Sequence, residues 1–214
     1  GTKHVLDHAE QCDVGRVLLI SSGAVYGADS RTRTPIGEES HAPSPSLPTD
    51  DFYGCGKRHI EQTGQDWSRN RCTTLTIARC FSFAGFGLPE HLAVSQFVRD
   101  ALRHPEIRVA GDGRAVRSLL YAADMAVWLL AVLARGRDGQ AYNVGAADGL
   151  STLQIATTIR DQNAPGKPIR VLGVDGASPR PFYVPDVGKI TKELGVSVWT
   201  TTAQGLEKMA SSAY

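Results

Sequence analysis

The chain has 214 residues, a formal net charge of +1 and 42% hydrophobic residues, which is enough apolar material for one substantial core. The near-neutral charge balance gives no reason to expect nucleic acid or an anionic membrane surface as a partner. No apolar run approaches the ~20 residues of a membrane span and no signal peptide opens the chain, so we expect a cytoplasmic protein.

The first predicted elements are a helix and a buried strand that ends in small polar residues. Apolar side chains at helical spacing predict a helix over residues 3–13, and the apolar run at residues 17–20 predicts a strand. This strand leads directly into Ser21-Ser22-Gly23. Because ligand sites in open α/β sheets lie at the carboxyl ends of strands, Ser22 is a candidate site residue.

Residues 28–50 are rich in proline, serine, threonine and charged residues, which predicts a loop. Two interpretations remain open. The loop is either a passive connector or a lid over a substrate, because long loops in compact domains often belong to a site. Its last residues, Thr49-Asp50-Asp51, predict the N-terminal cap of a helix.

That helix carries Tyr53 and Lys57, which are four residues apart and therefore lie on one helix face. A free phenol has a pKa near ~10, but a fixed positive charge nearby lowers the pKa of a phenol. A phenol tuned in this way can exchange a proton with a sugar or alcohol hydroxyl. Tyr53 and Lys57 are therefore a candidate catalytic pair, with Ser22 orienting the same oxygen. The alternative is an ordinary solvated helix surface.

The middle of the chain continues the alternation of strands and helices. Residues 73–78 are rich in β-branched side chains and predict a strand that runs into residues 79–87. A loop and helix over residues 88–104 and a short strand over residues 107–109 follow. Arg117 comes next, and its planar guanidinium offers paired donors to an anionic group, with a surface ion pair as the alternative.

The last third of the chain predicts a buried helix and several shorter elements. Residues 125–133 are apolar nearly all round, which predicts a buried helix with Asp124 as its N-cap. The further predicted elements are a strand over residues 140–145, a helix from Ser151 to Gln162, a strand over residues 168–172, a helix over residues 187–194 closed by Gly195, and a last helix over residues 202–213.

Two segments taken together resemble a known family. SSGAVYG, followed by YGCGKRHIE, resembles the active-site region of extended short-chain dehydrogenases/reductases. More narrowly, it resembles the NAD-dependent nucleotide-sugar epimerase/dehydratase family. The family order is a serine or threonine at a strand end, then Tyr-x-x-x-Lys, then an acidic residue one helical turn later. The matching residues here are Ser22, Tyr53, Lys57 and Glu61.

The resemblance implies roles for these side chains. Tyr53 would remove a sugar hydroxyl proton, Lys57 would bond the nicotinamide ribose hydroxyls, and Ser22 would orient the reacting oxygen. Ser21 and Phe81 would join Tyr53 and Lys57 in contacting NAD. NADP also remains open, because the segment that discriminates between the two cofactors is absent from the sequence.

The resemblance also implies a nucleoside-diphosphate sugar as substrate. Its contacts would come from Ser82, Gln96, Arg117 and Arg180. Arg117 matches the family arginine that grips the diphosphate, and Arg180 would be a second one, with a surface position as the alternative. Ser82 and Phe86 depart from the family, which usually has Asn and Pro there. Ser82 retains a hydroxyl that can donate one hydrogen bond.

The implied fold is the C-terminal part of a Rossmann-type doubly wound parallel sheet plus a small α/β substrate domain. Residues 1–84 and 118–146 would form the remaining half of the nucleotide-binding domain, and residues 85–117 and 147–214 would form the substrate domain. The chain contains no G-x-G-x-x-G motif, and its start resembles the helix before the serine strand. We therefore expect an N-terminally truncated chain that lacks most dinucleotide contacts.

The expected activity is that of a nucleotide-sugar epimerase, which oxidises the sugar transiently with NAD. The alternative is a 4,6-dehydratase or a reductase. Family dehydratases usually carry Asp-Glu after the serine or threonine, whereas Gly23-Ala24 here cannot transfer protons. An alternative of another class is a truncated, inactive chain that binds sugar nucleotide or only dimerises. We expect a homodimer of the full-length protein, reduced cysteines and no metal site.

Overall fold

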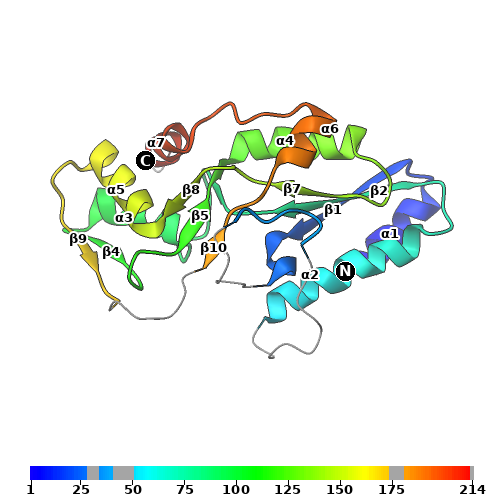
Figure 1. Ribbon diagram of the computed structural model, residues 1–214, viewed down its shortest axis with the longest axis horizontal. Helices are drawn as coiled ribbons and strands as arrows, with labels where there is room; N and C mark the ends of the chain where they lie inside the picture. The colour runs from blue at the N-terminus through cyan, green and yellow to red at the C-terminus, as the bar shows by residue number, and fades with distance from the viewer. Residues whose placement is uncertain (28–33, 41–50, 174–180, 213–214) are drawn as a thin grey trace.

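The computed structural model describes residues 1–27, 34–40, 51–173 and 181–212. Figure 1 shows two lobes, one built around a parallel sheet and the other around helices and short strands. This mixed α/β architecture with parallel strands is the predicted fold class. Among the described residues, no helix combines the length and the apolar composition that crossing a bilayer requires.

The main sheet has three parallel strands in the order β1-β2-β7. Their bounds are Arg16–Ser22 for β1, Thr74–Cys80 for β2 and Ala141–Val144 for β7. Ser22 is in register with Cys80, and Cys80 is in register with Val144. All three strands therefore end at the same edge, where ligands bind in open α/β sheets.

Helices cover both faces of this sheet, as Figure 1 shows. On one face lie α1 (Thr2–Gln11) and α2 (Phe52–Ser68), with Leu19, Trp67 and Ile77 in the shared core. On the other face lie α4 (Ala122–Arg135) and α6 (Gly188–Leu194), with Trp128 and Tyr142 buried beneath them. The sheet edge that carries Ser22 is thus held between two packed layers.

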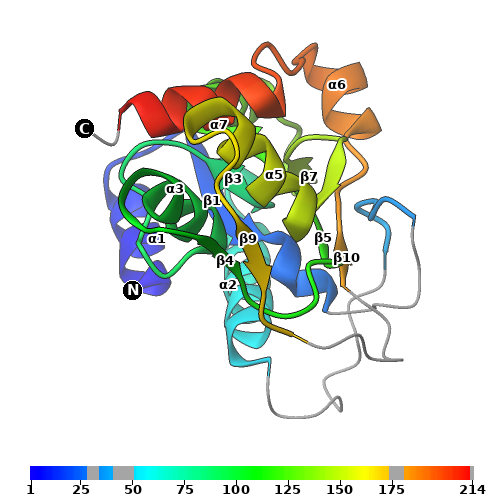
Figure 2. The same cartoon turned by 90° about the vertical axis from the view of Figure 1, so that its left-hand side faces the viewer.

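The second lobe packs α3 (Ala93–Arg103), α5 (Thr152–Asn163) and α7 (Thr202–Ser211) around one apolar core, which Figure 2 views end-on. Short strands complete this lobe in pairs or triplets. These strands are β3 (Phe83–Ala84) with β6 (Leu120–Tyr121), β4 (Ile107–Val109) with β9 (Ile169–Val171), and β10 (Phe182–Tyr183) with β5 (Val116–Ser118) and β8 (Gly149–Ser151).

Three of the predicted helix caps are present in the structure. Asp51 caps α2 by accepting the Gly54 N–H at 2.9 Å, whereas Thr49 and Asp50 lie outside the described residues. Ser151 caps α5 and forms a capping box with Gln154. Gly195 ends α6 at φ 65°, a left-handed conformation that glycine adopts without a steric penalty.

The sequence interpretation of α4 was wrong in two respects. Val127 is 48% exposed and Leu130 is 64% exposed, because the helix packs through the face that carries Trp128. Asp124 is not the N-cap, which is Tyr121. Its buried carboxylate instead accepts three hydrogen bonds from the 199–200 segment, so it fixes the chain that leads into α7.

Candidate active site

Ser22 is the last residue of β1 and begins a short 3-10 helix, η1 (Gly23–Tyr26). Its hydroxyl accepts the Ala24 N–H at 3.2 Å and thereby caps this turn. The Ser22 side chain is buried, but a hydroxyl that accepts one hydrogen bond still has a proton to donate. Ser22 therefore offers a fixed donor at the end of the strand.

Tyr53 and Lys57 lie in the first turns of α2, beside the same strand end. Lys57 Nζ donates to the Ile20 carbonyl oxygen at 2.9 Å and lies 5.8 Å from the centroid of the Tyr53 ring. Tyr53 is 63% exposed, so its phenol is accessible in the described chain. The structure thus brings the three predicted catalytic residues to one edge of the sheet.

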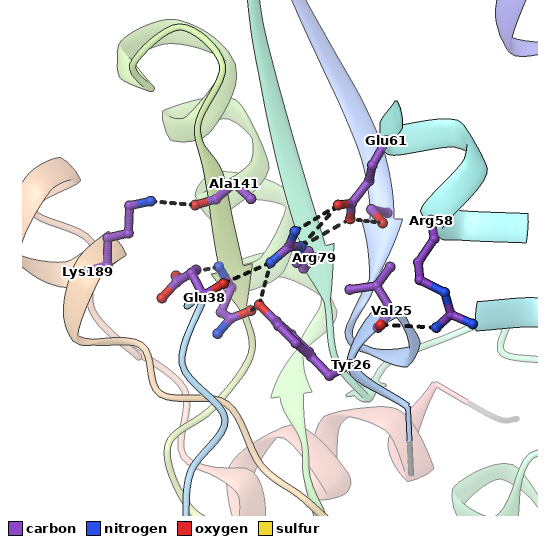
Figure 3. Close-up of polar contacts among 10 residues, drawn as sticks. Val25, Tyr26, Glu38, Arg58, Glu61, Arg79, Ala141 and Lys189 are labelled. Atoms are coloured by element: carbon purple, nitrogen blue, oxygen red, sulfur yellow. Dashed lines mark hydrogen bonds and ion pairs between the residues drawn. The ribbon is translucent and has the colours of Figure 1, made fainter. Parts of the chain in front are cut away.

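A buried ion pair joins α2 to the carboxyl end of β2, as Figure 3 shows. Arg79 on β2 donates to Glu61 on α2, with Nη2 lying 2.8 Å from Oε2. The Glu61 carboxylate also accepts the Ser21 hydroxyl at 2.5 Å. Glu61 lies one helical turn after Lys57, so the ion pair fixes α2 against the ends of β1 and β2.

Tyr26 extends this network toward β7. Its hydroxyl accepts Arg79 Nη1 at 2.9 Å and donates to Asn143 Oδ1 at 2.8 Å (Figure 3). Burial raises the pKa of Tyr26 to about 12, so its phenol remains a neutral donor. The turn that follows Ser22 is therefore bonded to both other strands of the sheet.

Asn143 anchors the described part of the long loop, residues 34–40. Its backbone N–H donates to the Glu38 carboxylate at 2.8 Å. Its side-chain Nδ2 donates to the carbonyl oxygens of Ile36 and Asp186, at 2.8 and 3.2 Å. This segment consequently lies fixed against the strand ends, and the lid interpretation of the rest of the loop stays a prediction because those residues lie outside the described ones.

Tyr183 on β10 lies directly against the catalytic strand end. A Cβ atom built on Gly23 would lie 2.6 Å from the Tyr183 hydroxyl oxygen and 2.7 Å from Cζ of Phe81. The rings of Phe81 and Tyr183 are 4.5 Å apart between centroids. Burial raises the pKa of Tyr183 to about 12, although a hydrogen bond from Ser22 opposes this. The Tyr183 phenol is therefore neutral and held between two lobes.

Arg117 and Ser82 line one cavity of about 330 Å³, together with apolar side chains such as Phe97. Burial lowers the pKa of the Arg117 guanidinium, which lies 5.5 Å from the centroid of the Tyr183 ring. A cation removed from water in this way is stabilised by an anion that pairs with it. The cavity therefore offers a cationic group at one end to an anion that enters it.

A comparison with known protein families shows the family of this chain. Residues 1–145 match the model of the NAD dependent epimerase/dehydratase family, which is more than half of the chain. The chain belongs to this family. Ser22, Tyr53 and Lys57 all fall within the matched part of the epimerase/dehydratase chain, whereas Tyr183 lies beyond it.

Relatives of this epimerase/dehydratase chain carry several activities. UDP-glucuronic acid decarboxylase 1 of Arabidopsis thaliana is 27% identical over 222 residues, which cover 99% of this chain and 48% of that protein. The dTDP-glucose 4,6-dehydratase DesIV of Streptomyces venezuelae, solved with NAD and TYD, has a TM-score of 0.82 at 26% identity and covers 98% of this chain and 63% of that one.

The same fold occurs in the UDP-glucose 4-epimerase of Thermotoga maritima, with a TM-score of 0.84 at 21% identity. That match covers 99% of this chain and 67% of the epimerase. The chain spans about half the length of the curated relatives it matches. The comparisons therefore show the family of the chain, and the relatives differ in the reaction that they catalyse.

Four further residues of the epimerase/dehydratase chain were predicted to contact the cofactor or the substrate. Gln96 Nε2 points to the Arg108 carbonyl oxygen at 3.5 Å, and Arg180 lies outside the described residues. Ser21 donates its hydroxyl to Glu61, and Phe81 is buried against Tyr183. The cofactor and substrate roles assigned to these four residues stay predictions.

Two functional features of this epimerase/dehydratase chain had no strong signal in the sequence. Tyr183 occurs in the short aromatic pair Phe182-Tyr183, where no periodicity distinguishes a site residue from a core residue. Asn143 lies in the strand predicted over residues 140–145, and the strand pattern does not distinguish it from its neighbours. A buried asparagine in a strand core, which must find partners for its amide, is the signal that could have identified it.

Proposed function

We propose that this chain carries the catalytic and sugar-nucleotide part of a nucleotide-sugar epimerase. Tyr53 would take the proton from a sugar hydroxyl, and Ser22 would hold the same oxygen by a hydrogen bond. The Lys57 ammonium would stabilise the phenolate form of Tyr53 as that proton moves. Support comes from the position of all three side chains at one strand end, with Tyr53 accessible.

The residues present fit the ribose and nicotinamide end of a dinucleotide cofactor. The Lys57 ammonium and the exposed Tyr53 phenol lie together where ribose hydroxyls can reach both. A bound nicotinamide ring, of NAD or NADP, would supply the hydride acceptor and donor. The sequence has no G-x-G-x-x-G turn for the pyrophosphate, so we expect the 214-residue chain not to retain NAD. Micromolar or tighter NAD binding in equilibrium dialysis would contradict this.

The choice of epimerase over dehydratase depends on Gly23 and Ala24. Neither side chain can transfer a proton, whereas expulsion of water from a sugar requires an acid and a base. A side chain at position 23 would also need Tyr183 and Phe81 to move, since its Cβ would lie within 2.8 Å of both. The lack of room for a side chain at Gly23 is the main observation in favour of an epimerase over a dehydratase.

The proposed substrate is a nucleoside-diphosphate sugar, bound between the strand end and the cavity of the second lobe. Arg117 would pair with the diphosphate, and Ser82 would donate one hydrogen bond to it. In this proposal, residues 1–84 and 118–146 form the nucleotide-binding part, and residues 85–117 and 147–214 form the substrate part.

Product analysis tests the proposal directly. The full-length protein that contains this chain is incubated with NAD and a panel of UDP-, dTDP- and GDP-sugars, and the sugars are examined by NMR. We expect inversion at one sugar carbon without formation of a 4-keto-6-deoxy sugar, and no product from the Tyr53→Phe variant. Dehydrated product would establish the dehydratase alternative, and sugar-nucleotide binding without turnover would establish a binding protein.

A further inference from the structure

Tyr183 connects the two ends of the proposed substrate site, and the proposed reaction gives it no role. We propose that Tyr183 is a positioning residue that holds the Arg117 guanidinium toward the substrate diphosphate without neutralising it. This inference rests on the proposed function and deepens it, because it explains how the diphosphate-binding cation is kept in place.

The strand register brings Tyr183 and Arg117 together. β10 and β5 are parallel neighbours, and Tyr183 is paired with Arg117 in their register. Residues paired across neighbouring strands project on the same face of a sheet, so the ring and the guanidinium lie side by side. The Arg117 guanidinium carbon lies 5.5 Å from the Tyr183 ring centroid, which is within the range of a cation–π interaction.

The Tyr183 ring is itself fixed on its other sides. Phe81 packs against it at 4.5 Å between centroids, and its hydroxyl oxygen occupies the space that a Cβ atom on Gly23 would need. Because these contacts come from the catalytic strand end, they hold the ring at a set distance from Ser22.

The electrostatics explain why a ring suits this position better than a carboxylate. Within the described part of the chain, the Arg117 guanidinium contacts the Val116 carbonyl oxygen, at 3.2 Å, and the Tyr183 ring. Both groups are uncharged, since burial keeps the Tyr183 phenol protonated. An aspartate or glutamate would orient Arg117 equally well but would cancel its charge. An aromatic ring orients the cation and leaves its full charge for the ligand.

Two substitutions separate the ring from the hydroxyl. Tyr183→Phe keeps the ring and its packing on Phe81, whereas Tyr183→Leu removes the ring. Isothermal titration of the 214-residue chain with UDP, dTDP, GDP and ADP measures the diphosphate affinity. We expect Tyr183→Leu to weaken the best of these ligands by roughly three- to thirty-fold and Tyr183→Phe by less than about two-fold. Tyr142→Phe removes another buried phenol hydroxyl, which donates to Glu193, and is the matched control.

A second measurement reports on Arg117 without any nucleotide. Phenylglyoxal modifies accessible guanidinium groups, and peptide mass spectrometry gives the rate at Arg117. We expect Tyr183→Leu to raise that rate several-fold, with Tyr183→Phe and Tyr142→Phe close to the parent. Circular dichroism and thermal melting verify that each variant is folded.

The outcomes are distinguishable. Equal affinity and equal Arg117 modification in the parent and in Tyr183→Leu would overturn the inference, as would a loss in Tyr183→Phe as large as in Tyr183→Leu. If the parent binds none of the diphosphates, the proposed function fails. The Arg117 modification rate then still decides whether the Tyr183 ring positions the guanidinium.

Discussion

The buried ion pair between Arg79 and Glu61 offers the sharpest test of how the candidate site is supported. The two side chains are 16% and 9% exposed, so solvent screening is weak. Among the described residues, Arg79→Met would leave the Ser21 hydroxyl as the one side-chain donor to the buried Glu61 carboxylate. Removing one partner of a buried pair costs about 3–5 kcal/mol. For a chain of this size, that corresponds to a fall of roughly 6–20 °C in the melting temperature.

The assay is thermal and urea unfolding followed by circular dichroism, with a double-mutant cycle. Glu61→Gln in the Arg79→Met background removes the uncompensated charge, so the double variant should be more stable than Arg79→Met alone by about 1 kcal/mol or more. Arg69→Met is the control, because Arg69 pairs with Asp66 on an exposed helix surface and should contribute less than about 1 kcal/mol. If Arg79→Met proves as mild as Arg69→Met, the reasoning fails.

Three further outcomes are expected. In the full-length protein, Tyr53→Phe should lower turnover by ~10²–10⁴-fold while sugar-nucleotide affinity stays within a few-fold, and near-normal rates would remove Tyr53 from the mechanism. Arg117→Ala should weaken sugar-nucleotide binding by about ten- to a hundred-and-fifty-fold in calorimetry, and Arg117→Lys should recover only part, since an ammonium lacks the paired donors. Burial also raises the pKa of Tyr142, but Tyr26 and Tyr183 have pKa values raised to about 12, so these two of the six tyrosines should ionise last in a spectrophotometric pH titration. Their contribution to stability should be complete below pH about 10 and lost as the pH rises through about 12, and unfolding measurements across that window check the sign.

The sequence predicted those parts of the site that depend on local spacing. Tyr53 and Lys57 lie one turn apart on any helix, and the apolar run before Ser22 indicates where a strand ends. The caps formed by Ser151 and Gly195 are equally local, because each acts within a few residues of its own helix end.

The parts that the sequence did not predict depend on contacts between distant segments. Arg79 meets Glu38 and Tyr26 only after the strands align, and Tyr183 meets Gly23 only because β10 returns to the catalytic edge. Strands of two or three residues, such as β3 and β10, are too short to show a period of two. The exposed face of α4 was missed because apolar periodicity indicates burial without indicating what covers each face.

The hydrogen bonds of Asn143 determine how deamidation of this side chain would affect the structure. Its Oδ1 accepts from Tyr26, whereas its Nδ2 donates to two carbonyl oxygens, so the two ends of the amide are not interchangeable. Deamidation would place a carboxylate oxygen against the carbonyls of Ile36 and Asp186, where no donor remains. Aspartate has nearly the same shape as asparagine, but it would replace these two hydrogen bonds with two repulsive contacts between oxygen atoms. Loss of ammonia at one buried side chain would release residues 34–40 from the strand ends.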